Sequence, residues 1–138
     1  MDIDHLFAQA EAFIKARQLS EAQRLYRKIL KSKPGHTRTN LAAADLALGQ
    51  NDLPTASRHL KRAEKQCKQN GQYWLLRGDY ELKMPDIDES MKCYEKALSF
   101  GADAIDVHLR YGNLFQAKKD FQRAVNEFER ELTLSPNH

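Results

Sequence analysis

Apolar residues follow one another at steps of three and four along the whole chain, beginning with the stripe formed by Leu6, Ala10 and Phe13. This spacing places them on one face of a helix and leaves the remaining faces polar. No segment alternates apolar and polar residues in the manner of a half-buried strand. The pattern therefore predicts an all-α protein.

A longer period is superimposed on the helical one. Small residues stand 34 positions apart at Ala22, Ala56, Ser90 and Ala124. Four positions after each of them comes a large apolar residue: Tyr26, Leu60, Tyr94 and Phe128. Self-similarity at such a period is the signature of stacked repeats. We therefore divide the single domain, 1–138, into four windows: 3–36, 37–70, 71–104 and 105–138.

Each window is predicted to hold two antiparallel helices. Turn-forming residues interrupt the apolar pattern in mid-window, as at 49–52 and 84–86. Small residues at facing positions, such as Ala10 and Ala22, let the two helices approach closely. One hairpin cannot bury its apolar face alone, whereas stacked copies bury a continuous core. The prediction is an α-α superhelix, or solenoid, of four helix-turn-helix hairpins, with eight helices.

Repeats with these landmarks resemble the tetratricopeptide repeat, and the resemblance covers 136 of the 138 residues. The third window is closest, with Trp74, Gly78, Asp86, Tyr94 and Ala97 at landmark positions. The second window is the poorest, because two landmark aromatics and the proline are replaced. The resemblance implies a concave groove lined by the first helix of each hairpin, and protein or peptide binding there. It implies no particular partner, because a fold alone does not determine function.

The first helices carry the candidate binding residues, which recur on one helix face at spacings of four and seven. Two apolar rows comprise Phe7, Leu41, Leu75 and Leu109, and Ile14, Leu48 and Leu82. Between them lie Glu11, Asp45, Asp79 and Asn113. Under the resemblance this face lines the groove, where it would suit a peptide with basic and apolar residues. Alternatively, some apolar residues are hairpin core and the acids are ordinary surface.

The sequence does not predict binding of an acidic chaperone peptide. Some members of the resembled family hold the acidic C-terminus of heat-shock chaperones with lysine, asparagine and arginine side chains. The matching positions here carry Phe7, Glu11, Ala42, Gln72 and Leu76. None supplies the required side chain, and Glu11 would repel a carboxylate.

Composition narrows the function classes. Net charge is only +3, from 22 basic and 19 acidic residues, so nucleic acid is not an expected partner. Basic residues do gather between 58 and 68, where they form either a solvated convex face or a site for an acidic partner or nucleic acid; the solvated face is favoured, because no aromatic residues interleave with the charges. Cys67 and Cys93 lack paired-thiol spacing, which favours a reducing, cytoplasmic location. Apolar runs are too short to predict a membrane span.

Catalytic chemistry is not predicted either. The five histidines fall at unrelated window positions, and the six glycines form no phosphate loop. We therefore predict a non-enzymatic scaffold that needs no cofactor or metal and holds a peptide or helix in the groove. The alternative is a docking or regulatory segment of a larger enzyme, such as a glycosyltransferase or sulfotransferase.

The last window ends in an apolar face made by Phe121, Val125, Phe128 and Leu132. A solenoid needs a polar terminal cap, and no further helix follows to cover this face. We expect it to pair either with a second copy, giving a homo-oligomer, or with a neighbouring chain, and its uncovered state favours a segment of a longer protein.

Overall fold

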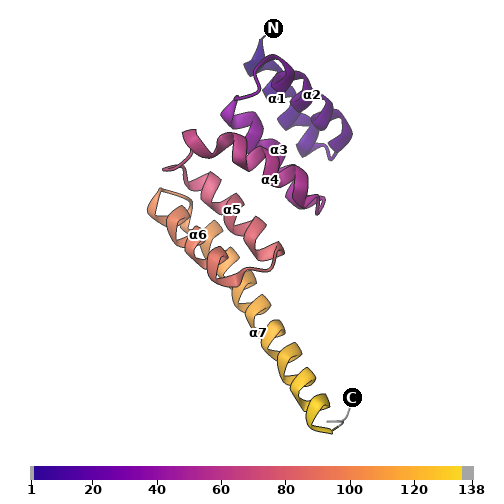
Figure 1. Cartoon of the computed structure of the whole chain (residues 1–138). Coiled ribbons are helices and arrows are strands. Elements are labelled where there is room, and N and C mark those ends of the chain that lie inside the picture. The colour runs from indigo at the N-terminus through magenta and orange to yellow at the C-terminus, as the bar shows by residue number, and fades with distance from the viewer. Residues whose placement is uncertain (1, 135–138) are drawn as a thin grey trace.

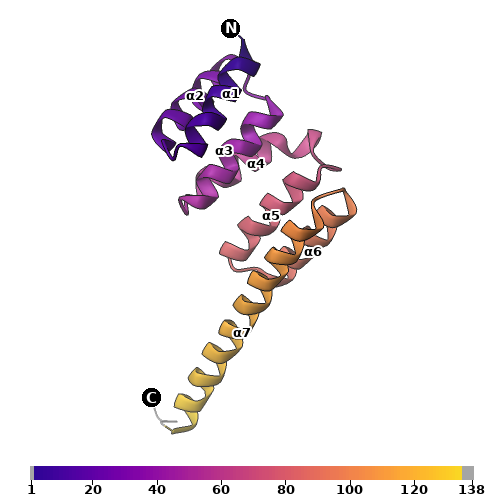
Figure 2. The same ribbon diagram turned by 180° about the vertical axis from the view of Figure 1, so that it is seen from behind.

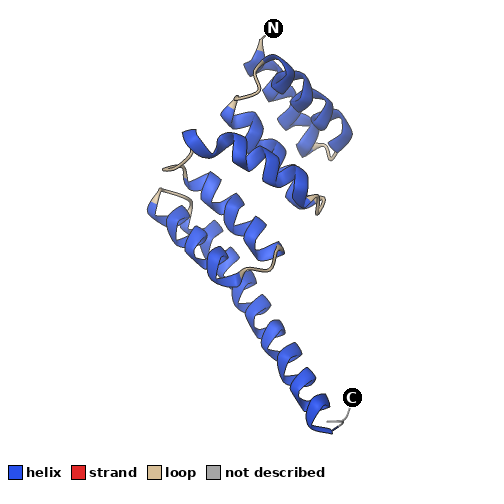
Figure 3. Ribbon diagram, in the orientation of Figure 1, coloured by secondary structure: helices blue, strands red, loops and turns tan. Residues whose placement is uncertain are grey.

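The computed structural model describes residues 2–134, and within that range it contains seven α-helices, one short 3₁₀ helix and no strand (Figures 1 and 3). The elements are α1 (Ile3–Lys15), α2 (Leu19–Ser32), α3 (Thr37–Gly49), α4 (Leu53–Ala63), η1 (Glu64–Gln66), α5 (Gly71–Lys83), α6 (Ile87–Ser99) and α7 (Ala104–Leu134). The first six α-helices pair as three consecutive hairpins that stack on one another (Figure 1). The predicted all-α solenoid is confirmed.

The three hairpin turns are built alike. The backbone N–H groups of Gln18, Asp52 and Asp86 each donate to the carbonyl five residues earlier, at 2.8, 2.8 and 2.7 Å. This bond satisfies a carbonyl left free at the end of the first helix. Arg17 and Asn51 adopt a left-handed φ of 59° in the first two turns. The Asp52 and Asp86 carboxylates then cap the second helices by accepting a backbone N–H three residues on.

The small residues mark where paired helices touch. Ala22, Ala56 and Ser90 are fully buried, as the 34-residue period predicts. A Cβ added at Gly78 would overlap the ring of Tyr94, so only glycine leaves room for that side chain. These contacts hold the two helices of each hairpin close together, and large apolar residues between hairpins complete the core.

The fourth window departs from the prediction of a hairpin. α7 continues as one 31-residue helix through residues 118–120, where the 34-residue period would repeat the turn at 84–86, so residues 2–134 hold seven α-helices rather than eight. Lys118 and Lys119 are ordinary helix formers, and no glycine or proline interrupts them. Asp120 accepts a hydrogen bond from Gln116 Nε2 at 3.1 Å, one turn earlier, instead of capping a new helix.

α7 therefore has two different halves. Its first half packs on α5 and α6, and its second half projects beyond the stack in both views (Figures 1 and 2). The predicted oligomer face lies on this projecting half, where Phe121 and Phe128 are 59% and 65% exposed. Although α7 is long, neither it nor any other helix described between residues 2 and 134 is apolar enough to cross a membrane.

Candidate functional site

Two adjoining clefts follow the first helices of the hairpins. The first, of about 520 Å³, lies between α1, α2 and α3 and is lined by Glu11, Ile14 and Asp45 among others. The second, of about 640 Å³, is lined from α3, α5, α6 and α7 and includes Asp45, Asp79 and Asn113. Because Asp45 belongs to both clefts, the predicted row of three acids and one amide runs along a shared surface.

Most of the predicted apolar rows lie in the core. Four of the seven residues are at most 8% exposed: Phe7, Leu41, Leu48 and Leu75. Ile14 and Leu82 are half-buried, and Leu109 is 64% exposed. The alternative interpretation, that these residues belong to the hairpin core, therefore describes the first four. A ligand on this face would meet the other three.

The acids at the α1–α3 end form a zone of negative charge. Glu11 and Asp45 are exposed, and neither forms an ion pair with any residue in the described range 2–134. Burial raises the pKa of Tyr26, which lines the same cleft, to about 12, with Glu11 and Asp45 adding to the rise. Desolvation raises the pKa of Asp45 as well, repulsion from Asp79 raises it further, and the charge of Arg110 offsets part of the rise. The charge of a cation placed here would lower both pKa values.

Asp79 has a different environment from the other acids of the row. Arg110 Nε donates to its Oδ1 at 2.9 Å, Arg110 Nη2 donates to its Oδ2 at 3.0 Å, and the Tyr94 hydroxyl donates to Oδ1 at 2.6 Å. Asp79 and Arg110 each expose 24% of the side chain. This carboxylate therefore joins α5, α6 and α7, and it is satisfied by its own chain.

Sequence reasoning missed Arg110. The same window position holds Ala8, Ala42 and Leu76 in the first three windows, so an arginine in the fourth was the available signal. Its charge lies in the second cleft beside Asn113 and offsets the negative row at that end. The groove is thus acidic near α1 and α3 and locally neutralised near α7.

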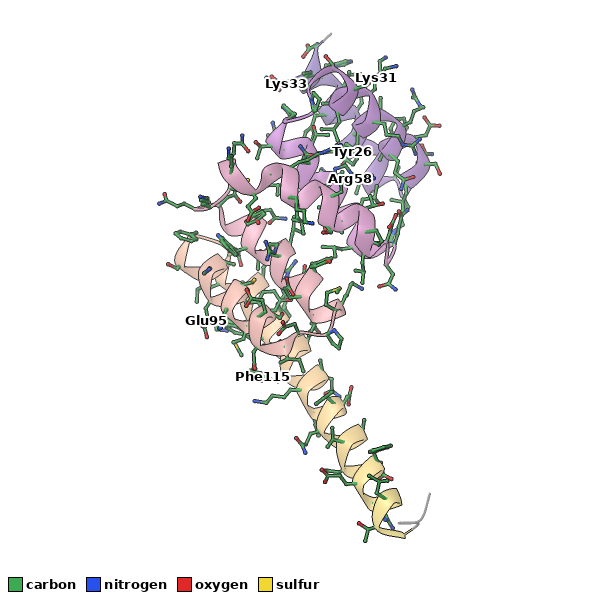
Figure 4. The ribbon with its side chains drawn as sticks, viewed as in Figure 1. Tyr26, Lys31, Lys33, Arg58, Glu95 and Phe115 are labelled. Carbon is green, nitrogen blue, oxygen red and sulfur yellow. The ribbon has the colours of Figure 1, made fainter. Side chains whose placement is uncertain are left out.

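A third cleft, of about 470 Å³, separates the second helices α2 and α4 and is lined by basic residues that include Lys31, Arg58 and Arg62 (Figure 4). His59 is buried at its wall, with Nδ1 3.0 Å from Asn40 Oδ1. Burial, followed by the charges of Arg58 and Arg62, lowers the pKa of His59 to about 4. The ring is therefore neutral at neutral pH.

Neither thiol is activated. Burial raises the pKa of Cys67, and it raises the pKa of Cys93 to about 11, so both are protonated near pH 7 and are poor nucleophiles. Within residues 2–134, no three side chains of histidine, cysteine, aspartate or glutamate gather in an arrangement that could hold a metal ion.

Comparisons with known proteins give a consistent result. Models of the tetratricopeptide repeat match residues 13–80, 71–100 and 105–138. Cilia- and flagella-associated protein 70 of Homo sapiens is 25% identical over 100 residues, which are 70% of this chain and 9% of that protein. The chain thus spans a small part of this curated relative.

Solved structures share the fold, among them two that superpose over most of this chain. The first tetratricopeptide domain of Spaghetti (RPAP3), bound to the HSP90 peptide SRMEEVD, superposes with a TM-score of 0.73 at 16% identity, covering 85% of this chain and 93% of that one. The MamA RS-1 ArsTM double mutant superposes with a TM-score of 0.71 at 19% identity, covering 99% and 78%. At these identities the likeness establishes the fold alone.

Proposed function

The chain belongs to the tetratricopeptide repeat family, and we propose that it is a scaffold that holds a basic, partly apolar peptide or helix against the first helices of its hairpins. The observation that carries this proposal is the pair of exposed carboxylates, Glu11 and Asp45. They line one cleft, and neither has an ion-pair partner among residues 2–134, although Lys15 lines the same cleft. A lysine or arginine of a ligand would supply that partner.

The energetics divide between charge and apolar contact. Exposed ion pairs contribute at most about 1 kcal/mol each, so the two acids alone cannot give a stable complex. Ile14, Leu82 and Leu109 offer accessible apolar surface along the same path, and its burial contributes roughly 25 cal/mol per Å². The acids would therefore set the orientation and register of the ligand, while the apolar contacts supply most of the affinity.

The solved neighbour that binds SRMEEVD provides a contrast. That peptide is acidic, whereas this chain presents Glu11 and Asp45 on its first helices. Two of the positions expected to hold clamp side chains carry Phe7 and Leu76, which are 5% and 0% exposed. Like-charge repulsion would disfavour an acidic peptide in this groove, so we infer a ligand of the opposite charge.

Selection from a phage-displayed random peptide library would test the proposal. We expect enriched peptides to combine basic and apolar residues. Binding of a recovered peptide, followed by fluorescence polarisation, should weaken up to about fivefold in Asp45→Asn and in Glu11→Gln. Glu95→Gln, an exposed change on the outer helix α6, is the matched control and should leave affinity unchanged (Figure 4).

The pH dependence provides a second measurement. A bound cation lowers the pKa of Asp45, so affinity should rise as the pH increases through that pKa, and Asp45→Asn should flatten the rise. Recovery of acidic peptides would contradict the proposal. So would loss of binding in Arg58→Gln with Lys61→Gln while Asp45→Asn binds normally, which would place the site on the basic second helix.

The enzyme-linked alternative uses the same groove. As a docking segment of a glycosyltransferase or sulfotransferase, the chain would still bind a peptide, but on behalf of a catalytic domain elsewhere. The mass of the native protein in its source cells would separate the two. The cytoplasmic location likewise stays a prediction, to be checked by cell fractionation.

A further inference from the structure

We propose that two copies of this chain pair by exchanging the second half of α7, so that residues 121–134 of each complete the hairpin begun by residues 104–117 of the other. The proposal concerns the end of the stack and does not depend on what the groove binds.

The first observation is open space beside Gly112, at the position where a hairpin would hold a ring; we call this space the recess. In the third window, Gly78 leaves room for the ring of Tyr94, 16 positions later. Gly112 and Phe128 stand at the same two positions of the fourth window. No atom beyond its own helix and chain neighbours lies within 4 Å of a Cβ added at Gly112, and Phe128 is 65% exposed. In a straight helix, 16 residues hold the recess and the ring about 24 Å apart.

The second observation is that both halves of α7 present exposed apolar side chains. On the projecting half they are Phe121, Phe128 and Leu132, and on the first half Ile105 and Phe115. Each of these five is at least 48% exposed. Ala124 is exposed too, although its counterparts Ala22, Ala56 and Ser90 are fully buried in their hairpins. The projecting half therefore has the sequence of a second hairpin helix without the packing of one.

The third observation explains why the same chain does not supply this packing. α7 is unbroken across residues 118–120, and the Gln116–Asp120 hydrogen bond lies along it. While this segment is helical, residues 121–134 cannot fold back on residues 104–117 of their own chain. A second copy carries the complementary half, and an exchange about a two-fold axis covers both halves at once. The exchange also explains why the family model of the repeat matches residues 105–138, although α7 does not form a hairpin there.

Sedimentation velocity and light scattering on the 138-residue chain test the pairing. At tens of micromolar we expect twice the monomer mass of 15.9 kDa. Phe128→Glu should raise the dimer dissociation constant at least tenfold, and Gly112→Leu should do the same by filling the recess. Asn126→Glu is the matched control, because its counterparts Arg24, Arg58 and Lys92 stay exposed in the formed hairpins. It should leave the dimer intact.

A hinge variant separates exchange from simple face-to-face contact. Lys118→Gln with Lys119→Asn reproduces residues 50–52, which form a turn, and should yield a monomer with a closed fourth hairpin. Lys119→Ala keeps the segment helical and should remain dimeric. A monomeric wild-type chain, or a dimer unaffected by Phe128→Glu, would overturn the proposal. If Phe128→Glu dissociated the copies but the hinge variant stayed fully dimeric, the copies would pair without exchange and the proposal would also be wrong.

Discussion

Replacing Asp79 with asparagine should weaken the stack where α7 joins it. The Asp79 carboxylate accepts hydrogen bonds from Arg110 and from the Tyr94 hydroxyl, so it connects three helices. Asparagine keeps the size of the side chain and one acceptor oxygen but removes the charge. Arg110 would then remain only 24% exposed without a full counter-charge.

The expected coupling between Asp79 and Arg110 follows from their hydrogen-bond geometry and from the exposure of their side chains. Hydrogen bonds to charged groups contribute about 1.5–3 kcal/mol to stability when well formed. Because Asp79 and Arg110 are partly open to solvent, screening reduces this range. We therefore expect a coupling free energy of about 1–2 kcal/mol between the two residues, above the value for surface pairs.

A double-mutant cycle measures this coupling. Urea unfolding of the wild type, Asp79→Asn, Arg110→Gln and the double variant, followed by circular dichroism at the helical minimum, gives the four free energies. The exposed pair Glu21–Arg24, at 3.1 Å with side chains 49% and 59% exposed, is the control cycle and should give less than about 0.5 kcal/mol. A coupling for Asp79–Arg110 no larger than the control value would refute the assignment of Asp79 as a structural residue.

Three further predictions concern stability. Because burial lowers the pKa of His59 from 6.5 to about 4, its neutral ring contributes stability that is present above pH 6.5 and is lost as the pH falls through 4. The loss amounts to about 3 kcal/mol, and it should be absent when His59→Gln is unfolded by urea across the same pH range. Gly78→Ala should destabilise by about 1–3 kcal/mol, because overlap with the Tyr94 ring outweighs the higher helix propensity of alanine. In a Phe128→Glu background, Gly112→Ala should instead stabilise by up to about 1 kcal/mol, as thermal unfolding would show.

The repeat could be predicted from the sequence because helix contact restricts the size of the side chain at particular positions. Close helix contact admits only alanine, serine or glycine, and that requirement recurs wherever the hairpin recurs. Ala22, Ala56 and Ser90 are fully buried for this reason. The sequence did not decide whether Leu41 and Leu75 line the groove or lie in the core, because one apolar stripe can face either a groove or a neighbouring hairpin; in the structure both are buried.

Whether α7 turns or continues at residue 119 depends on a small free-energy difference between turn and helix. The pattern of apolar and small residues does not encode this difference. Arg17 takes a left-handed conformation in the first turn, so a charged, unbranched residue is sterically able to turn there. Lys119 occupies the same window position and is helical. A left-handed residue costs roughly 1–2 kcal/mol, which packing of the following helix must repay. The choice between turn and helix is thus made by tertiary contacts, and a one-dimensional pattern does not record them.

The acid row shows how repeat symmetry can mislead about a site. Glu11, Asp45 and Asp79 share one window position, and equal positions suggested equal roles. Arg110 comes from the fourth window and forms its ion pair with Asp79, so the groove has a direction that the repeat itself lacks. We therefore expect a ligand to place its basic residues near α1 and α3 and its apolar residues near Leu109. A peptide whose basic and apolar segments follow in the reverse order would have to bind with its N- and C-termini exchanged. The order of the two segments in recovered peptides therefore reports the direction in which the ligand runs along the groove.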